Sequence, residues 1–175
     1  MALFWASLLC SAGRRASALS LYRSSGAAAT LLTLTIAVIV GYAWLRGIPG
    51  SVLNFGTYAA MPLWETAMLP QSMGLACLFL CLLAGARLDA SAMQSLVFSA
   101  VVAVCFVPWG LAACIGLMGM AGIFADVLFF WIKGILLLRI GVRSFGFLRP
   151  IMLWPLWCLG AALLLGPELI RIGAG

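Results

Sequence analysis

The stretch 122–142, GIFADVLFFWIKGILLLRIGV, is apolar over the length of a membrane helix and yet contains Asp126 and Lys133. An ionised Asp or Lys near the middle of a membrane helix costs roughly 2.5–3.5 kcal/mol, so each of these side chains needs a partner. The two residues are seven positions apart, about two helical turns, which puts them on one face of the helix. This segment is where we expect the chain to carry its function.

The composition around this segment is that of a membrane protein. Of 175 residues, 66% are hydrophobic and 8% are charged, and the mean hydropathy is +1.22. A soluble domain of this size would need far more charge to cover its surface. We therefore predict an all-α, polytopic membrane helix bundle of about 5–7 transmembrane helices. The length favours one integral-membrane domain over residues 1–175.

The apolar runs indicate where the helices lie. The candidate spans are residues 2–13, 26–46, 70–86, 92–116, 120–142 and 150–167. The stretch 47–69 contains Gly, Pro and Asn, so we interpret it as an irregular or re-entrant connection rather than a continuous span.

Small residues and a proline mark the 92–116 span and the turn after it. Pro108 is expected to kink the helix, because it lacks the N–H that would complete the backbone ladder. Gly110, Gly116 and Gly119 follow at close spacing. A surface of small residues favours tight contact between helices, so we assign Pro108 and these glycines to helix packing.

Arginines at the ends of the spans predict the orientation. If alternate connections share one side of the membrane, seven arginines fall together: Arg14, Arg15, Arg23, Arg87, Arg139, Arg143 and Arg149. Only Arg46 and Arg171 lie opposite. The positive-inside rule makes the arginine-rich side cytoplasmic, or matrix-like in a mitochondrion. We expect a bacterial inner membrane first and a mitochondrial inner membrane second, with lipid rather than nucleic acid around the net charge of +6.

The residue inventory argues against catalysis, metals and cofactors. The chain has no His, and its six Cys lie within apolar runs rather than in paired metal-ligand spacings. No catalytic triad pattern or phosphate-binding glycine loop is present in the sequence. We predict no catalytic residue, no metal ligand and no cofactor.

Three acids and one lysine leave alternatives open. Asp126 and Lys133 are candidates for an ion path, but they could instead form a buried ion pair, or Lys133 could extend to the membrane surface. Glu65 could line a polar pocket of that path or be an interfacial carboxylate. Glu168 follows Gly166-Pro167 at the end of the last span, so we expect it to be solvated.

Three stretches suggest a family. Apolar helices end in Gly13-Arg14-Arg15 and Gly85-Ala86-Arg87, and the third stretch runs from Gly122-Ile-Phe-Ala-Asp126 through Arg139 to Arg143-Ser-Phe-Gly-Phe-Leu148. Together they resemble hydrogenase-4 component E, which is similar to the K subunit of respiratory complex I and the C subunit of Mrp-type multisubunit sodium/proton antiporters. The resemblance implies a non-catalytic, accessory membrane subunit of a proton- or sodium-translocating respiratory complex. Its partners would be antiporter-like subunits, and Asp126 is the ion-path candidate that the resemblance supports.

The sequence departs from that family in one informative place. The family has an intramembrane glutamate in the helix after the second arginine turn, but residues 95–100 here read SLVFSA. This departure argues against proton transport by the chain alone.

Other interpretations remain open. Phe106-Val-Pro-Trp-Gly110, with Lys133 and Arg149-Pro150, is similar to the C-terminal part of the complex I H-subunit family. The alternatives in function are a free-standing small transporter or channel subunit and a purely structural membrane scaffold.

Overall fold

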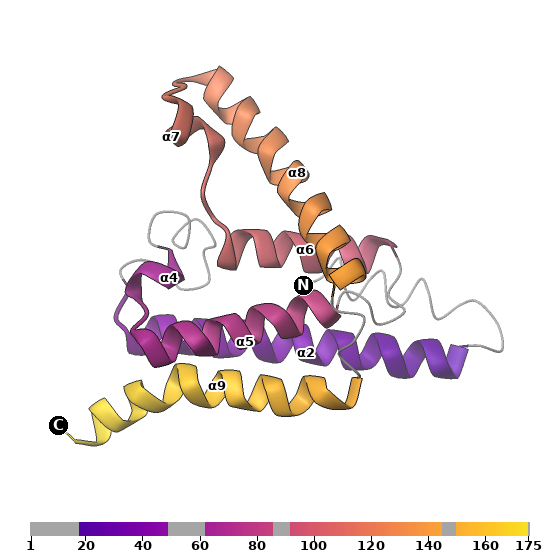
Figure 1. The fold of residues 1–175 in the computed structure, drawn as a ribbon, viewed down its shortest axis with the longest axis vertical. Helices are drawn as coiled ribbons and strands as arrows, with labels where there is room; N and C mark the ends of the chain where they lie inside the picture. The colour runs from indigo at the N-terminus through magenta and orange to yellow at the C-terminus, as the bar shows by residue number, and fades with distance from the viewer. Residues whose placement is uncertain (1–17, 49–61, 86–91, 145–149, 175) are drawn as a thin grey trace.

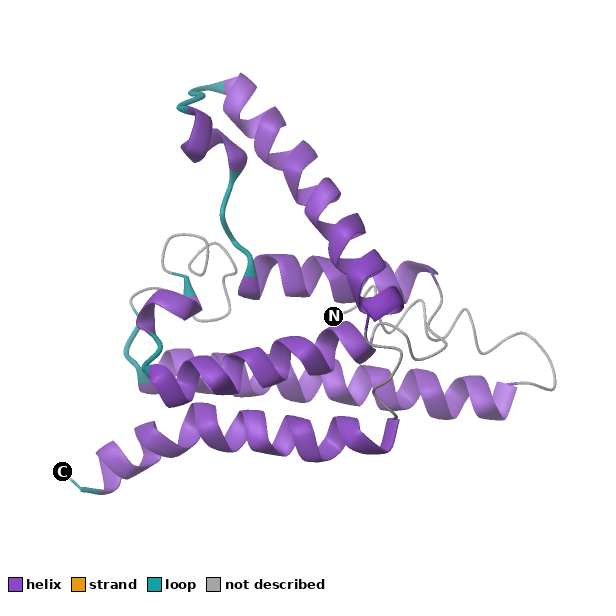
Figure 2. Ribbon diagram, in the orientation of Figure 1, coloured by secondary structure: helices purple, strands orange, loops and turns teal. Residues whose placement is uncertain are grey.

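The computed structural model describes residues 18–48, 62–85, 92–144 and 150–174 of the chain. Within these residues there are helices, turns and loops but no strand, so the all-α prediction is confirmed there (Figure 2). The helices are α2 (Ala18–Leu45), α4 (Leu63–Thr66), α5 (Leu69–Gly85), α6 (Ala92–Phe106), α7 (Leu111–Ile115), α8 (Met120–Ser144) and α9 (Pro150–Gly173).

Three of the described helices have the length and composition to cross a membrane. Their apolar spans are Gly26–Leu45, Met120–Gly141 and Ile151–Gly173, each near the roughly 20 residues that a bilayer requires. Leu69–Gly85 and Ser95–Phe106 are apolar but shorter. The structure thus has the helices of a membrane protein, whereas the number of 5–7 spans stays a prediction. The expected 2–13 span lies outside the described residues.

Helices α2, α5 and α9 lie side by side and form the body of the molecule, with α5 antiparallel to the other two (Figure 1). Helices α5 and α9 approach closely where Gly74 faces Gly160. A Cβ atom on Gly74 would lie 2.7 Å from the carbonyl oxygen of Gly160 and 2.8 Å from the backbone nitrogen of Leu164. Small residues at such a crossing bring two backbones into dispersion contact, which is the main attraction between helices in lipid.

Two threonine hydroxyls of α2, the exposed Thr33 and the buried Thr35, are paired with backbone carbonyls of the same helix. Thr33 and Thr35 donate to the carbonyls four residues earlier, at 2.8 and 2.7 Å. The Thr35 hydroxyl also accepts a 3.0 Å hydrogen bond from Nε1 of Trp157. This bond joins α2 to α9 inside the body, where an unpaired indole N–H would be costly.

The apolar core is shared by five of the described helices, and α4 contributes Leu63 to it. Its fully buried members include Leu32, Ile39 and Tyr42 of α2, Leu75, Leu78 and Leu82 of α5, Phe98 and Phe106 of α6, and Leu164 of α9. The aromatic rings of α6 thereby attach that helix to the body through α5.

The predicted 92–116 span is interrupted rather than kinked, which corrects the sequence prediction. Helix α6 ends at Phe106, residues 107–110 are not helical, and α7 begins at Leu111. Pro108 supplies the local reason, because it has no N–H to donate and its ring obstructs the preceding turn. We call residues 92–144, which contain α6, α7 and α8, the arm.

Helices α7 and α8 of the arm rise away from the body, whereas α6 lies next to it and packs against it through Phe98 and Phe106 (Figure 1). Helix α8 meets α6 and the end of α5 near its own C-terminal end, where a Cβ on Gly141 would lie 2.7 Å from the Leu83 carbonyl oxygen. Over its most apolar 18 residues, only 6% of α8 is buried within the chain. Most of this helix therefore has no cover from the rest of the described protein.

The assignment of Gly116 and Gly119 to helix packing is wrong. Both have positive φ, +72° and +70°, and a Cβ at either position would meet open space. Gly116 ends α7 in the left-handed conformation, and together they form the turn that leads into α8.

Four of the described arginines lie in two places, two of them around Glu168 and two near the C-terminal end of α8. Arg46 and Arg171 lie at the same end of the body, where both contact Glu168. Arg139 is exposed near the end of α8, two residues before Gly141. Arg143 follows in the same helix, while Arg14, Arg15, Arg87 and Arg149 lie outside the described residues. The cytoplasmic orientation stays a prediction.

The close crossing of α5 and α9 gives a direct test. Gly74→Ala should lower the stability of the folded chain by about 1–3 kcal/mol, because the added methyl overlaps backbone atoms and forces the helices apart. Gly166→Ala in α9 is the matched control, since its Cβ would meet nothing within 4 Å. Unfolding in detergent micelles, followed by circular dichroism, should show an early transition for the first variant only.

Candidate functional site

Lys133 lies against the interrupted segment between α6 and α7. Its Nζ donates to the carbonyl oxygens of Val107 and Trp109, at 2.7 Å each. It also lies 5.1 Å from the centre of the Phe129 ring, within cation–π range. Both carbonyls belong to non-helical residues between α6 and α7, where backbone acceptors need a partner. The positive charge also lies beside the C-terminal end of α6, where it interacts favourably with the helix dipole.

Lys133 pairs with backbone carbonyls, and Asp126 pairs with a backbone N–H group at the start of α7. Its Oδ1 accepts a 2.8 Å hydrogen bond from the backbone nitrogen of Ala112, in the first turn of that helix. The carboxylate lies against Gly110, where a Cβ would come within 2.7 and 2.9 Å of its two oxygens. Asp126 thus caps α7 from a neighbouring helix, and Gly110 leaves the room that this requires.

Asp126 and Lys133 of α8 therefore hold the interrupted segment between α6 and α7 from both sides. The prediction that they share a face of the helix is confirmed in this sense, because both reach residues 107–112. They form no direct ion pair with each other. Their charged atoms instead bind backbone groups in the segment that Pro108 interrupts. This favours a structural role for both residues over a role in ion transfer.

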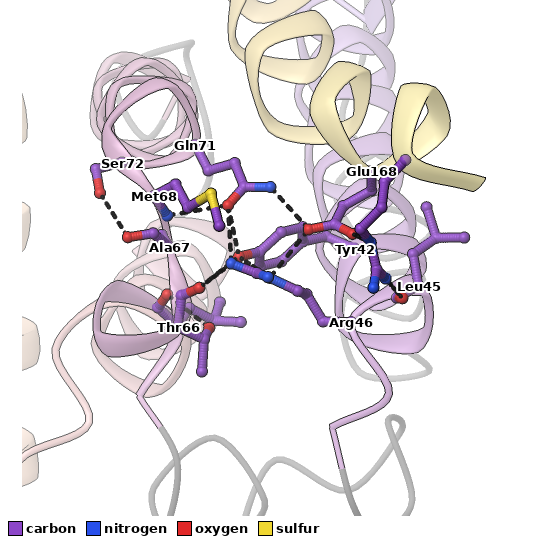
Figure 3. A network of polar contacts seen from close by, with 11 residues as sticks. Tyr42, Leu45, Arg46, Thr66, Ala67, Met68, Gln71, Ser72 and Glu168 are labelled. Carbon is purple, nitrogen blue, oxygen red and sulfur yellow. Dashed lines mark hydrogen bonds and ion pairs between the residues drawn. The ribbon is translucent and has the colours of Figure 1, made fainter. Parts of the chain in front are cut away.

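A second polar centre, not expected from the sequence, joins α2, α5 and α9 (Figure 3). Glu168 lies at the centre of this polar cluster, and its side chain is only 2% exposed. One carboxylate oxygen, Oε1, lies 3.0 Å from Nε of Arg46 and accepts from Nε2 of Gln71 at 2.9 Å. The other, Oε2, lies 2.9 Å from Nε of Arg171. Three donors, two of them charged, compensate the burial of this carboxylate.

Arg46 connects Glu168 to the segment before α5. Its Nη2 donates to the carbonyl oxygen of Thr66 and to Oε1 of Gln71, and its Nε lies 3.3 Å from the Tyr42 hydroxyl. The Tyr42 hydrogen bond raises the pKa of the Arg46 guanidinium, and the charge of Glu168 adds to this effect. Arg46 therefore remains charged over the whole physiological range.

Two further contacts complete the second centre. Oε1 of Gln71 accepts a 3.0 Å hydrogen bond from the backbone nitrogen of Met68, which holds the start of α5. Nη2 of Arg171 donates to the carbonyl oxygen of Leu45 at 3.0 Å, which satisfies a group at the end of α2. The ends of three helices are thereby tied to one carboxylate.

The expectation that Glu168 is solvated is wrong. Helix α9 does not end at Pro167 but continues to Gly173, and the extra turns return Glu168 to the body. A proline inside a membrane-type helix removes one hydrogen bond without necessarily ending the helix. The signal in the sequence was Arg171, three residues after Glu168, together with Arg46 directly after a long apolar span.

Glu65 takes no part in either centre. Its side chain is exposed on α4, and it forms no ion pair with the described residues. Its neighbour Trp64 donates from Nε1 to the carbonyl oxygen of Phe106 at 2.6 Å, which attaches α4 to the end of α6. The three predicted ion-path residues are therefore not brought into one polar cluster.

The second centre predicts unequal effects of two similar substitutions. Glu168→Gln should destabilise the chain by about 3 kcal/mol, near the lower end for a broken buried pair, because Arg171 is 61% exposed and retains water. Glu65→Gln, at an exposed position, should stay within about 0.5 kcal/mol of the parent chain. Thermal unfolding of both variants in the same detergent measures the difference, and equal midpoints would contradict the assigned role of Glu168.

Comparisons with known proteins leave the family open. No protein-family model, no curated protein and no solved structure matches the chain. The resemblance to hydrogenase-4 component E therefore stays a prediction from the sequence.

Proposed function

We propose that this chain is a non-catalytic, accessory membrane subunit whose arm packs against another membrane protein. The observation that supports it is that the other described residues leave α8 largely uncovered, with only 6% of its most apolar 18 residues buried. The exposed large hydrophobic side chains of α8 are Met120, Ile123, Phe124, Val127, Leu128, Trp131, Ile132, Ile135, Leu136 and Ile140. On a membrane helix such a surface contacts either lipid acyl chains or a helix of another protein, and we propose the second.

The way in which the arm is held supports a protein partner. Lys133 and Asp126 fix α8 to residues 107–112, so the helix is presented at a set angle rather than loosely. A surface that is rigid before contact loses less conformational entropy on association. Packing against a neighbouring helix would supply the dispersion contacts that bind helices together in lipid.

The kind of partner follows from the sequence resemblance. We propose that the chain belongs to a hydrogenase-4- or complex I-like, proton- or sodium-translocating respiratory complex of a bacterial inner membrane. Antiporter-like subunits of that complex would cover the arm. In this assembly the chain contributes structure, and the ion path lies largely in its partners, because the charges of Asp126 and Lys133 are engaged by backbone groups.

Co-purification from native membranes tests the partner surface. The tagged full chain should retain large antiporter-like subunits in mild detergent, and Phe124→Ala with Leu128→Ala should reduce their yield several-fold because two exposed contacts are lost. Ile151→Ala with Met152→Ala, also exposed but on α9, should leave the yield unchanged. Recovery of only a small homo-oligomer would instead support a free-standing transporter or channel.

Two substitutions of Asp126 separate the structural role from ion transfer. Asn keeps an oxygen that accepts from Ala112 but carries no charge, whereas Ala removes the acceptor. With a structural role, Asp126→Asn preserves assembly and ion translocation, and Asp126→Ala lowers both together through a loss of about 0.5–2 kcal/mol of capping. Ion flux into vesicles that contain the complex is the measurement. Loss of flux in the Asn variant with assembly intact would establish the relay.

A further inference from the structure

We propose that Arg46 and Arg171 form a binding site for the phosphate group of an anionic membrane lipid. The first support is an excess of positive charge in the second polar centre. Two guanidinium groups share the single carboxylate of Glu168, and both oxygens of that carboxylate are already used. The three charges sum to +1, so this end of the body attracts an anion.

Arg171 retains the donors that a phosphate needs. A guanidinium group has five N–H donors, and Arg171 directs Nε to Glu168 and Nη2 to the Leu45 carbonyl. Its Nη1 has no hydrogen bond within the described part of the chain, and its side chain is 61% exposed. Arginine binds phosphate oxygens well because its planar fork matches their geometry.

The location is suited to a lipid headgroup rather than to a soluble anion. Arg46 directly follows the apolar span Gly26–Leu45, and Arg171 lies in the last turn of α9, so both would lie at the membrane surface. Trp44 is 71% exposed beside them, as aromatic residues at that depth commonly are. Exposed Leu169 and Ile170 on α9 offer an apolar surface along which acyl chains can lie.

The site is also preorganised. Glu168 and Gln71 are buried, and they orient both guanidinium groups before any ligand arrives. A phosphate would therefore bind without the entropy cost of ordering two long side chains. The exposed carboxylate of Glu65 directly precedes Thr66, whose carbonyl accepts from Arg46, so its repulsion of an anion is limited by solvent and salt alone. This inference does not depend on the proposed role as a subunit.

Lipid titration of the purified full chain tests the site. Native mass spectrometry in detergent should show tighter binding of phosphatidylglycerol than of phosphatidylcholine. Arg171→Gln should weaken phosphatidylglycerol binding about fivefold, the effect expected for one interfacial cation. Arg171→Lys should recover part of the loss, since it restores the charge without the fork. Arg139→Gln removes an exposed arginine from α8 and should change nothing.

Further measurements control for loss of structure and for binding of inorganic phosphate instead of lipid. Glu65→Gln, which leaves the network untouched, should preserve or strengthen phosphatidylglycerol binding. Equal affinities for the two lipids in the parent chain, or equal losses in the Arg171 and Arg139 variants, would overturn the proposal. Binding of inorganic phosphate without a preference for the anionic lipid would also overturn it, because the site would then serve a free anion.

Discussion

The buried carboxylate of Glu168 is the constraint on which the body of this protein depends. A charge that is 2% exposed is tolerable only if donors surround it, and here they come from the end of α2, the start of α5 and α9 itself. Because those donors lie on three helices, the relative positions of the helices are set together rather than pairwise. The Gly74–Gly160 crossing then brings α5 and α9 into close contact, and the core side chains fill the space around it. In an apolar environment such a network specifies the arrangement of helices whose surfaces otherwise resemble one another.

In the arm, too, polar groups in an apolar environment need partners, and here the groups belong to the backbone. Pro108 interrupts the α6–α7 segment and releases backbone carbonyl and N–H groups that lipid could not satisfy. Lys133 takes the carbonyls on one side, and Asp126 takes an N–H on the other. Unpaired charges at Asp126 and Lys133 would cost free energy in a membrane, and so would unpaired backbone groups around Pro108. In this structure the charges and the backbone groups are partners of one another. Each explains the presence of the other, and neither requires a transported ion.

The sequence predicts the helices better than it predicts their partners. Long apolar runs identified α2, α5, α8 and α9 because membrane-type helices are defined by local composition. Membrane energetics also identified Asp126 and Lys133 as residues that need compensation. Their partners were not predictable, since backbone groups at 107–112 have no sequence signature beyond Pro108. Glu168 was misjudged because the local rule, that a helix ends near Gly-Pro, was overridden by contacts with Arg46 and Gln71, which are distant in sequence. Gly116 and Gly119 failed similarly, since a glycine suits both a helix crossing and a left-handed turn.

The contrast between the two regions bears on what the chain can do. Among the described residues, the polar groups around Glu168 are paired inside the body, and Phe98 and Phe106 of α6 close its core. The arm satisfies its polar groups but leaves the apolar surface of α8 uncovered. If α8 were a pump element, its charges would have to leave their backbone partners during each cycle and expose the interruption at Pro108. The ends of α6 and α7 would then lose their compensation at the moment when a proton or ion moved. An arm that keeps both charges engaged while it offers its apolar surface to a partner avoids that cost, and for this physical reason we favour assembly over transport.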